Sequence, residues 1–383
     1  MLRILKSFNL HRLLRNVNPS EKVRIGVVGG GFGSVFEWHK HPHCAVEAVC
    51  DPIPEKRQRL MQVYGCGKAY EDLEELLQDR RVDAVALFTP APNHAEHTVK
   101  CLKAGKHVLC AVPACMTLEE ANMLLETVRE TGLNYMMAET SWYHQAVISA
   151  RKWFSEGRFG RIFYTEAEYY HPGLASLFYD NNGNRTWRYG FPPMHYPTHC
   201  TAYLVGVSGE SMVSVSCVGW GDGSPILKDN AYNNPFWNET AFFITNKGNA
   251  FRVSVYWNAP IGPCERGQWF GEKMSFFEPH PNGTKHVVWR AGNSLFDMPQ
   301  LEDYQQTEWW RTAMLPETLR HPSGHDGSHT FIVHEFIESI VEKRPPAIGV
   351  YEALAMTVPG IIAHQSALRG GRQMEIPRIG FSV

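Results

Sequence analysis

The sequence predicts an α/β protein of two domains, in which a doubly wound parallel sheet precedes an α+β domain with an open, mainly antiparallel sheet. Up to about residue 139, short apolar runs alternate with segments of helical periodicity, the order that builds a parallel sheet. Beyond residue 145, longer runs alternate polar and apolar residues at period two, which is typical of antiparallel strands with one covered face. The length of 383 residues, with 44% hydrophobic residues, suits two cores. We therefore expect an N-terminal arm over 1–20, a first domain over 21–142 and a second domain over 143–383, with terminal helices packing back on the body.

The first domain is predicted from five apolar runs and two helical segments between them. Strands are expected at 23–28, 45–50, 82–88, 107–110 and 135–138, and helices near 93–104 and 117–131. Ligands of parallel sheets lie beyond the carboxyl ends of the strands. The first candidates for binding residues are therefore the segments that follow the last three strands, 89–94, 111–113 and 139–144.

The second domain is predicted from a helix through Trp153 and a series of alternating runs. The strands are expected at 161–170, 212–220, 240–245, 250–257 and 268–277, and two further helices at about 329–341 and 351–369. A polar, aromatic loop at 180–193 separates the first two strands. No internal repeat or low-complexity tract appears in the sequence, which excludes solenoid architectures.

Directly after the first strand, residues 29–34 read Gly-Gly-Gly-Phe-Gly-Ser, and Asp51 ends the second apolar run. A strand that enters a tight glycine turn, followed by a helix whose N-terminal N–H groups point at phosphates, is the layout of a dinucleotide-binding turn. A carboxylate at the second strand's end can accept hydrogen bonds from an adenosine ribose and would repel a 2′-phosphate, which favours NAD as the cofactor. Ser34 stands where the motif usually has a third glycine. The residues predicted to hold the dinucleotide here are Gly29, Gly31, Phe32, Gly33 and Asp51.

Composition excludes several other classes of function. The 37 basic and 39 acidic residues are well mixed and give a formal net charge of −2, so nucleic acid and membrane surfaces are not expected partners. Nine cysteines without a C-x-x-C pair are typical of reduced core residues, which favours a cytoplasmic protein over a disulfide framework or a zinc site. The basic N-terminal arm has no apolar run long enough for a signal peptide or a membrane span, and we expect it to pack on the body or on a partner subunit.

A set of short motifs spread along the chain points to a known family. They are Gly26-Val27-Val28-Gly29-Gly30-Gly31, Asp51-Pro52, Val82-Asp83-Ala84-Val85, Thr89-Pro90 with His94, Ala104-Gly105-Lys106-His107-Val108, Pro113 and Thr117-Leu118-Glu119-Glu120. Together they resemble the glucose-fructose oxidoreductase and inositol dehydrogenase (Gfo/Idh/MocA) family of NAD(P)-dependent sugar enzymes. The resemblance implies a Rossmann domain before a larger α/β domain whose open sheet covers the substrate and often mediates oligomerisation. It therefore implies a small-molecule carbohydrate substrate and a homo-oligomer, either a dimer or a tetramer.

One motif departs from that family's common pattern. Most dehydrogenases of the family carry Glu-Lys-Pro after the fifth strand, with the lysine near nicotinamide and substrate, whereas this chain has Ala111-Val112-Pro113. Valine can neither donate a hydrogen bond nor take a proton. The chain is more similar to the NAD-dependent α-N-acetylgalactosaminidases and related redox-neutral glycosidases, which have valine at this position. Shared segments are Tyr196-Pro197-Thr198-His199, Met136-Met137 with Glu139 and Tyr143, and Tyr169 with His171.

The resemblance to this branch implies glycoside hydrolysis with no net use of cofactor. Oxidation of a ring hydroxyl carbon acidifies the neighbouring C–H, elimination expels the glycosidic oxygen, and water addition and re-reduction follow. We assign His199 and Tyr196 to proton transfer at the oxidised hydroxyl, since Tyr-x-x-His would place both on one face of a helix starting near Pro197. Tyr143 or Tyr169 is the candidate for removing the proton from carbon. The alternative is that these tyrosines only line a sheet.

Contacts to the cofactor are also expected beyond the glycine turn. The predicted residues are Thr89, Pro90, Asn93, His94, Val112, Pro113, Glu139 and Trp187. For Asn93, capping of the following helix is the simpler interpretation, and it is compatible with a cofactor contact. For Trp187, the alternative is an exposed loop residue without a role.

Two histidine groups raise the question of a metal, and the prediction is that there is none. His39, His41 and His43 alternate where no fixed geometry is assured, and Pro197 separates His195 from His199. A polar turn at 324–329 offers His325 and His329 as weaker candidates for substrate contact. Two functions remain as alternatives to the glycosidase: an ordinary NAD-dependent sugar dehydrogenase, in which His199 replaces the lysine, and a non-catalytic sugar or NAD sensor.

Overall fold

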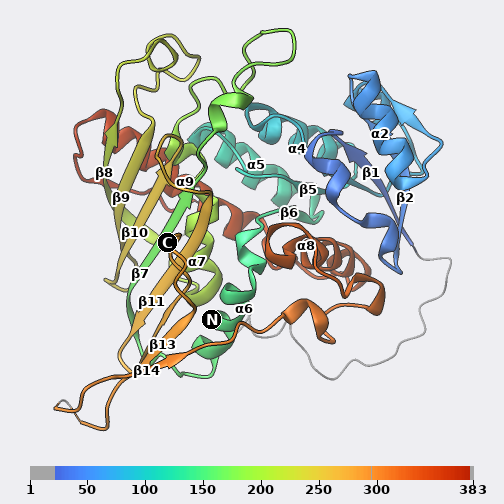
Figure 1. The fold of residues 1–383 in the computed structure, drawn as a ribbon. Coiled ribbons are helices and arrows are strands. Elements are labelled where there is room, and N and C mark those ends of the chain that lie inside the picture. The colour runs from blue at the N-terminus through green and yellow to red at the C-terminus, as the bar shows by residue number, and fades with distance from the viewer. Residues whose placement is uncertain (1–21, 295, 380–383) are drawn as a thin grey trace. The chain divides into compact units, whose positions relative to one another are not determined.

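The computed structural model describes residues 22–294 and 296–379 (Figure 1), so the predicted arm over 1–20 lies outside the described residues. The chain divides into two compact units. The first contains the described residues up to His144 together with 308–354, and the second contains 145–307 and the described residues from 355 onwards. The chain thus returns to the first unit after completing most of the second, which differs from the single division after residue 142 expected from the sequence.

The first unit is built on a six-stranded parallel sheet of order β3-β2-β1-β4-β5-β6. Its strands are β1 (Val23–Val28), β2 (Cys44–Cys50), β3 (Ala69–Tyr70), β4 (Ala84–Leu87), β5 (His107–Cys110) and β6 (Tyr135–Met137). The predicted parallel sheet is therefore confirmed. The strand order reverses at β1, and the edge beyond β1 and β4 is where a doubly wound sheet binds its ligand.

The helices of the first unit are α2 (Pro54–Tyr64), α3 (Leu73–Leu77), α4 (His94–Lys103), α5 (Leu118–Thr131) and α8 (Gly324–Val341). Both ends of helix α5 are defined by capping contacts. The Thr117 side chain accepts the Glu120 N–H, the Glu120 carboxylate accepts the Met116 N–H, and Gly132 ends the helix in the left-handed region at φ 64°. These capping contacts explain why the predicted limits of this helix were accurate.

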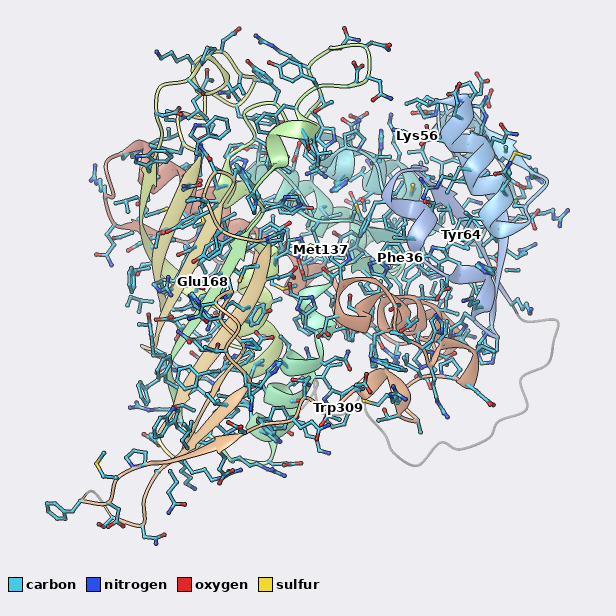
Figure 2. The ribbon with its side chains drawn as sticks, in the orientation of Figure 1. Phe36, Lys56, Tyr64, Met137, Glu168 and Trp309 are labelled. Carbon is cyan, nitrogen blue, oxygen red and sulfur yellow. The ribbon has the colours of Figure 1, made fainter. Side chains whose placement is uncertain are left out.

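The helix expected directly after the glycine turn is not formed, so that prediction was wrong. Two short 3₁₀ turns, η1 (Phe32–Val35) and η2 (Trp38–Lys40), take its place. Phe36 and Trp38 are fully buried, with Phe36 stacked on Phe88, and the Tyr64 hydroxyl lies 2.8 Å from the Phe36 carbonyl oxygen (Figure 2). The free energy gained by burying the Phe36 and Trp38 rings exceeds the small intrinsic preference of this segment for a helix.

The second unit is built on a nine-stranded sheet of order β14-β13-β12-β11-β7-β10-β9-β8-β15. Its strands are β7 (Ile162–Tyr170), β8 (Met212–Trp220), β9 (Asn238–Thr245), β10 (Ala250–Tyr256), β11 (Cys264–Gly271), β12 (Met274–Phe277), β13 (Val287–Arg290), β14 (Gln300–Asp303) and β15 (Met374–Glu375). All neighbouring pairs are antiparallel except β7 with β10, which confirms the mainly antiparallel sheet. The single strand expected at 268–277 is instead a hairpin of β11 and β12, because the chain reverses after Gly271 where a Cβ would lie within 3.0 Å of the Phe159 carbonyl.

Helices α6 (Gln145–Ser155), α7 (Thr198–Ser208) and α9 (Val350–Leu368) supply the helical part of this unit, α9 from residue 355 onwards. Every residue of α7 is buried. The helix packs so tightly on the sheet that a Cβ at Gly267 would overlap the Tyr203 ring, and the Trp269 indole N–H donates to the Tyr203 carbonyl at 2.8 Å. Side chains on the α7 side of the sheet are therefore held in fixed positions. Glu168 lies on the other side, where Arg252 and Arg266 each pair with it at 2.8 Å (Figure 2).

Within 22–294 and 296–379, no helix combines the length and the apolar character needed to cross a membrane.

Candidate active site

The glycine turn after β1 is shaped by close packing on three of its four glycines. A Cβ would lie closer than 3.0 Å to the Phe88 carbonyl at Gly29, to the Lys56 carbonyl at Gly30 and to the Phe88 ring at Gly33. Gly29 also has φ 98°, a conformation that costs side-chain-bearing residues energy. Gly31 differs, because no atom lies within 4 Å of its Cβ position. The turn is thus locked on one side and open at Gly31, where a pyrophosphate could approach the main chain.

Asp51 ties this turn to the end of β2. Its buried carboxylate accepts the Gly30 N–H at 2.6 Å and the Ile53 N–H at 2.8 Å. Each carboxylate oxygen has further lone-pair capacity for a ribose hydroxyl. The glycine turn and Asp51 therefore fit an unphosphorylated dinucleotide.

Phe32 projects from the open side of the turn, with 39% of its surface exposed. Its ring meets the rings of His325 and His329 edge-on at 5.5 and 5.6 Å. The two histidines, His325 through Nδ1 and His329 through Nε2, lie 2.8 Å apart, and His325 and Asp326 both adopt positive φ, 50° and 53°. Burial lowers the pKa of His329 to about 4. The turn at 324–329 is therefore a strained segment packed beside the glycine turn within one unit.

The ends of β4 and β5 are joined through His94. Its Nδ1 lies 2.7 Å from the Pro113 carbonyl oxygen and its Nε2 lies 2.8 Å from the Thr89 carbonyl oxygen. His94 thus holds together the two loops predicted to contact the cofactor. Asn93 occupies the N-cap position of α4, but its side chain makes no capping hydrogen bond, so the simpler interpretation given for it is wrong.

Most of the other predicted residues of the first unit occupy buried positions. Val112 is buried, and Pro90 is exposed at the β4 loop. The Glu139 carboxylate is fully buried and accepts the Ser141 N–H at 2.8 Å. The Tyr143 ring is stacked on Phe331 of α8, with 5.6 Å between ring centroids. Tyr143 therefore belongs to a packed aromatic pair in the unit that carries the glycine turn.

In the second unit, three of the predicted catalytic side chains come together. The ring of His199 lies 4.7 Å from Tyr169 and 5.1 Å from Tyr196, and the two tyrosines are 5.9 Å apart. Trp257 meets both tyrosine rings edge-on. Helix α7 begins at Thr198, so Tyr196 precedes it and does not share a helical face with His199 as expected. The two rings still meet, because the chain turns at Pro197 before entering the helix.

Glu265 joins this cluster and was not predicted. Its Oε1 lies 3.4 Å from His199 Nδ1, and only 7% of the His199 side chain and 15% of the Glu265 side chain are exposed. The signal in the sequence was the alternation of Glu265, Gly267 and Trp269 along β11, which places alternate residues on one face. A carboxylate at Nδ1 orients an imidazole so that Nε2 can accept a proton.

The remaining predicted residues of the second unit lie near this cluster or in the 180–193 loop. His171 is 5.9 Å from Tyr169, and burial lowers the pKa of His171. Trp187 stacks with the Arg188 guanidinium at 4.1 Å, and its carbonyl oxygen accepts a hydrogen bond from the Tyr232 hydroxyl. Trp187 is therefore an anchored loop residue with an aromatic face.

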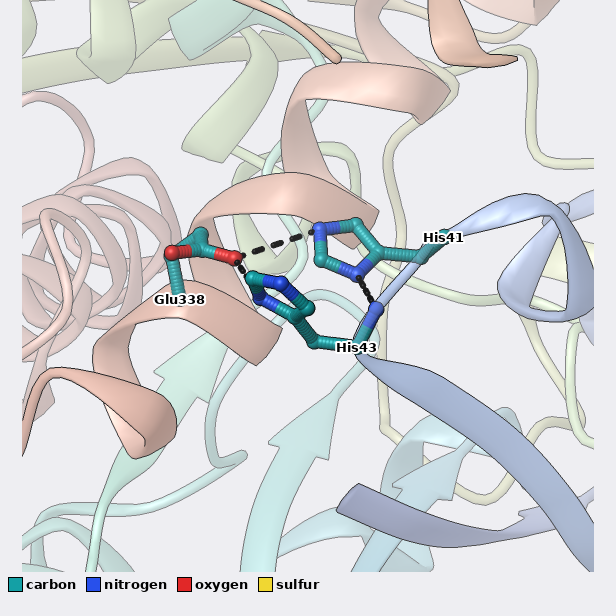
Figure 3. A group of neighbouring side chains, drawn as sticks. All are labelled: His41, His43 and Glu338. Carbon is teal, nitrogen blue, oxygen red and sulfur yellow. Dashed lines mark hydrogen bonds and ion pairs between the residues drawn. The ribbon is translucent and has the colours of Figure 1, made fainter. Parts of the chain in front are cut away.

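His41 and His43 do meet a carboxylate, that of Glu338 on α8 (Figure 3). His43 Nδ1 lies 2.8 Å and His41 Nε2 lies 3.7 Å from Glu338 Oε1. However, the His43 main-chain N–H donates to His41 Nδ1 at 3.1 Å, so the neutral His41 ring carries its proton on Nε2, 3.0 Å from His334 Nδ1. A metal-binding Nε2 would need the opposite tautomer. The hydrogen bonds thus oppose ligation by His41, and the absence of a metal stays a prediction. His39 does not belong to this group, and its ring lies edge-on to Tyr64.

Two family models match separate parts of the chain. Residues 23–139 match the oxidoreductase family with an NAD-binding Rossmann fold, and residues 272–381 match the C-terminal domain of glycosyl hydrolase 109. A glycosyl hydrolase family 109 protein of Stenotrophomonas maltophilia (strain K279a) is 23% identical over 93% of this chain and 88% of its own length. One of Solibacter usitatus (strain Ellin6076) is 25% identical over 94% and 88%.

Solved structures show the same fold. An oxidoreductase domain protein from Kribbella flavida superimposes with a TM-score of 0.77 at 19% identity, covering 93% of this chain and 99% of its own. Levoglucosan dehydrogenase in complex with NADH gives a TM-score of 0.75 at 18% identity, covering 94% and 100%. The first unit is thus an NAD-binding Rossmann fold, as the glycine turn predicted.

Proposed function

Because the chain belongs to the Gfo/Idh/MocA family of NAD-binding oxidoreductases, we propose that it is an NAD-dependent enzyme that hydrolyses a glycoside without net consumption of the cofactor. The glycoside is oxidised at a ring hydroxyl carbon, loses its aglycone by elimination, adds water and is reduced again. The names of its curated relatives, glycosyl hydrolase family 109, support this choice over a simple sugar dehydrogenase.

One observation carries the proposal: His199 is paired with Glu265 and in ring contact with Tyr169 and Tyr196. A glycosidase of this kind needs a base for the hydroxyl, a base for the carbon acid and a donor for the developing enolate. An imidazole held by a carboxylate and two tyrosine hydroxyls supply all three groups. The second unit therefore contains a complete acid–base set.

NAD⁺, which the glycine turn and Asp51 would hold, would supply a hydride acceptor for the oxidation and a hydride donor for the final reduction. His199 takes the hydroxyl proton at Nε2, while Glu265 at Nδ1 holds the ring in orientation and stabilises its protonated form. Tyr196 donates a hydrogen bond to the carbonyl oxygen. Tyr169 removes the proton from the neighbouring carbon, helped by the positive charge that His199 then carries.

Val112 explains why His199 has this role. It stands where related dehydrogenases carry a lysine, and its buried side chain offers no donor or acceptor. Proton transfer at the hydroxyl must therefore come from another group. His199 is the strongest candidate because its orienting carboxylate is already in place.

The test is to incubate the purified protein with a panel of aryl glycosides, without added cofactor, and to record both aglycone release and NADH absorbance. We expect aglycone release without net NADH. Net NADH together with a free oxidised sugar would instead identify a dehydrogenase. No turnover across the panel despite measurable NAD binding would identify a sensor.

His199→Ala tests the assignment of the base. We expect turnover to fall by at least about 10³-fold, with NAD affinity unchanged, because the cofactor-binding turn belongs to the other unit. His280→Ala, at an exposed position of the same unit, should leave both unchanged. Loss of NAD binding in His199→Ala would contradict the assignment.

A further inference from the structure

The short segment from Met194 to Pro197 determines where the Tyr196 ring lies. It contains the end of the 3₁₀ turn η6 (Pro193–His195) and leads directly into α7, which carries His199. Strand β9 and helix α9 both contact it. The contacts made by Glu239 of β9 and by Gly360 and His364 of α9 have no role in the acid–base set described above.

Glu239 uses its two carboxylate oxygens on different elements. Its Oε2 accepts the Met194 N–H at 2.8 Å, and its Oε1 lies 2.8 Å from His364 Nδ1. The side chains of Glu239 and His364 are almost completely buried. A buried carboxylate is stable only when it is paired and hydrogen-bonded, so both partners are needed to keep Glu239 in place.

Gly360 brings α9 into direct contact with the same segment. A Cβ at Gly360 would lie closer than 3.0 Å to the Met194 carbonyl oxygen and to the Pro197 ring. One turn before it, the Met356 carbonyl accepts the Thr201 hydroxyl of α7 at 2.9 Å. The segment before α7 is thus clamped between Glu239 and the surface of α9.

The contact between Glu239 and His364 also bears on which ring nitrogen carries hydrogen in His364 and in the neighbouring His195. Glu239 accepts the Nδ1–H of His364, so a His364 ring that carries a single hydrogen has its lone pair on Nε2. His364 Nε2 and His195 Nδ1 are both buried, and neither has a partner among the residues that the structure describes. The two rings meet edge-on, with centroids 5.1 Å apart. Burial and the neighbouring His364 lower the pKa of His195 to about 3, so this ring is neutral near pH 7. An acceptor at His364 Nε2 is complementary to an N–H at His195 Nδ1 through one bridging water.

We propose that Glu239, His364 and His195 form a buried positioning relay that holds the Tyr196 segment in place and fixes the tautomer of His195. Glu239 sets the main chain at Met194 and the tautomer of His364, and His364 in turn sets Nδ1 as the protonated nitrogen of His195. Its effect on catalysis rests on the proposed function, in which Tyr196 and His199 act on the sugar.

Glu239→Gln tests the relay with little change of shape. The amide oxygen must face the Met194 N–H, so the amide NH₂ faces His364 Nδ1, which can accept only if that ring moves its proton to Nε2. His195 must then move its proton from Nδ1 to Nε2 as well. Ring ¹⁵N chemical shifts distinguish protonated from unprotonated nitrogens, and in the full-length NAD-bound protein we expect both histidines to change tautomer. We also expect kcat to fall about 10- to 100-fold, with KM and NAD affinity unchanged.

Two further variants keep the test decisive. Glu302→Gln removes an exposed carboxylate of β14 that pairs with Arg290 of β13, and it should change neither the histidine tautomers nor kcat. His364→Gln is the fallback if Glu239→Gln does not fold. Its amide can still donate a hydrogen bond to Glu239, and we expect it to alter the ring ¹⁵N shifts of His195. Unchanged His195 shifts in whichever of the two relay variants folds would overturn the relay. An unchanged kcat, with shifts altered, would overturn its positioning role. The tautomer measurement needs no substrate, so a tautomer change in a protein that cleaves no glycoside would reject the proposed function alone.

Discussion

In the first unit, the groups that fit the dinucleotide act mostly through the main chain, whereas the candidate acid–base groups of the second unit are all side chains. The glycine turn works because three Cβ atoms are excluded by packing and the fourth position is open. The second-unit cluster is drawn from Tyr169, Tyr196, His199 and Glu265, which lie on three separate segments. The glycines of the cofactor turn lie close together in the sequence and form a recognisable motif, whereas the residues of the acid–base cluster come from segments that lie far apart in the sequence.

The largest expected effect separates the two kinds of glycine in the turn. Gly29→Ala should reduce NAD affinity by about 10³-fold and destabilise the first unit, because its Cβ would meet the Phe88 carbonyl at a positive φ. Gly31→Ala has space for its Cβ and should fold normally, but it should weaken NAD binding by obstructing the open side of the turn. Titration with NAD and thermal unfolding measure both variants. Equal thermal stability of the two variants would show that Gly29 is no more restricted by packing than Gly31.

The next effect concerns the side chain that the sequence did not reveal. Glu265→Gln should lower kcat about 10²-fold, because the amide cannot stabilise a protonated His199. The melting temperature and NAD affinity should change little. Glu272→Gln is the matched control, since Glu272 follows the same strand and pairs with Arg161 at the surface. If the two variants had the same kcat, His199 would not depend on its carboxylate partner.

Elements of the fold were predictable from the sequence where local patterns determine them, and were missed where tertiary packing does. The parallel strands were predictable because runs such as 23–28 and 107–110 are largely apolar and buried, and α5 because both of its ends are capped. The missing helix after the glycine turn depends on where Phe36 and Trp38 are buried, which is a tertiary preference. Strand β13 was missed because it is short, and strand β14 because it is short and exposed along its whole length.

The candidate site was predictable only in part, for a related reason. Tyr196 and His199 belong to one local motif, but Glu265 reaches His199 through the pairing of β11 with β7, where it lies opposite Tyr169. That pairing joins residues 96 positions apart. A strand limit predicted at residue 268 left Glu265 outside any element and hid its inward orientation. Likewise, Glu239 and His364 meet only after β9 and α9 have packed.

The smallest expected effect is a difference in acid sensitivity between the units. In the first unit, burial lowers the pKa of His41 to about 2 and of His329 and His334 to about 4. In the second unit, burial lowers the pKa of His195 to about 3 and also lowers that of His171. The unfolded chain binds these protons below about pH 6.5, and the folded chain does not, so each group removes stability as the pH falls from about 6.5 towards its folded pKa. Burial raises the pKa of Glu338, which acts in the opposite direction and offsets part of the loss.

We therefore expect the first unit to lose more stability than the second between pH 7 and pH 5, by about 1 to 2 kcal/mol. Amide hydrogen exchange, corrected for its intrinsic pH dependence, measures each unit separately. His329→Gln removes one of the titrating groups from the first unit and should narrow the difference, while exposed His280→Gln should not. A larger loss of protection in the second unit would show that its acid–base cluster, and not the buried histidines around the glycine turn, governs the response to acid.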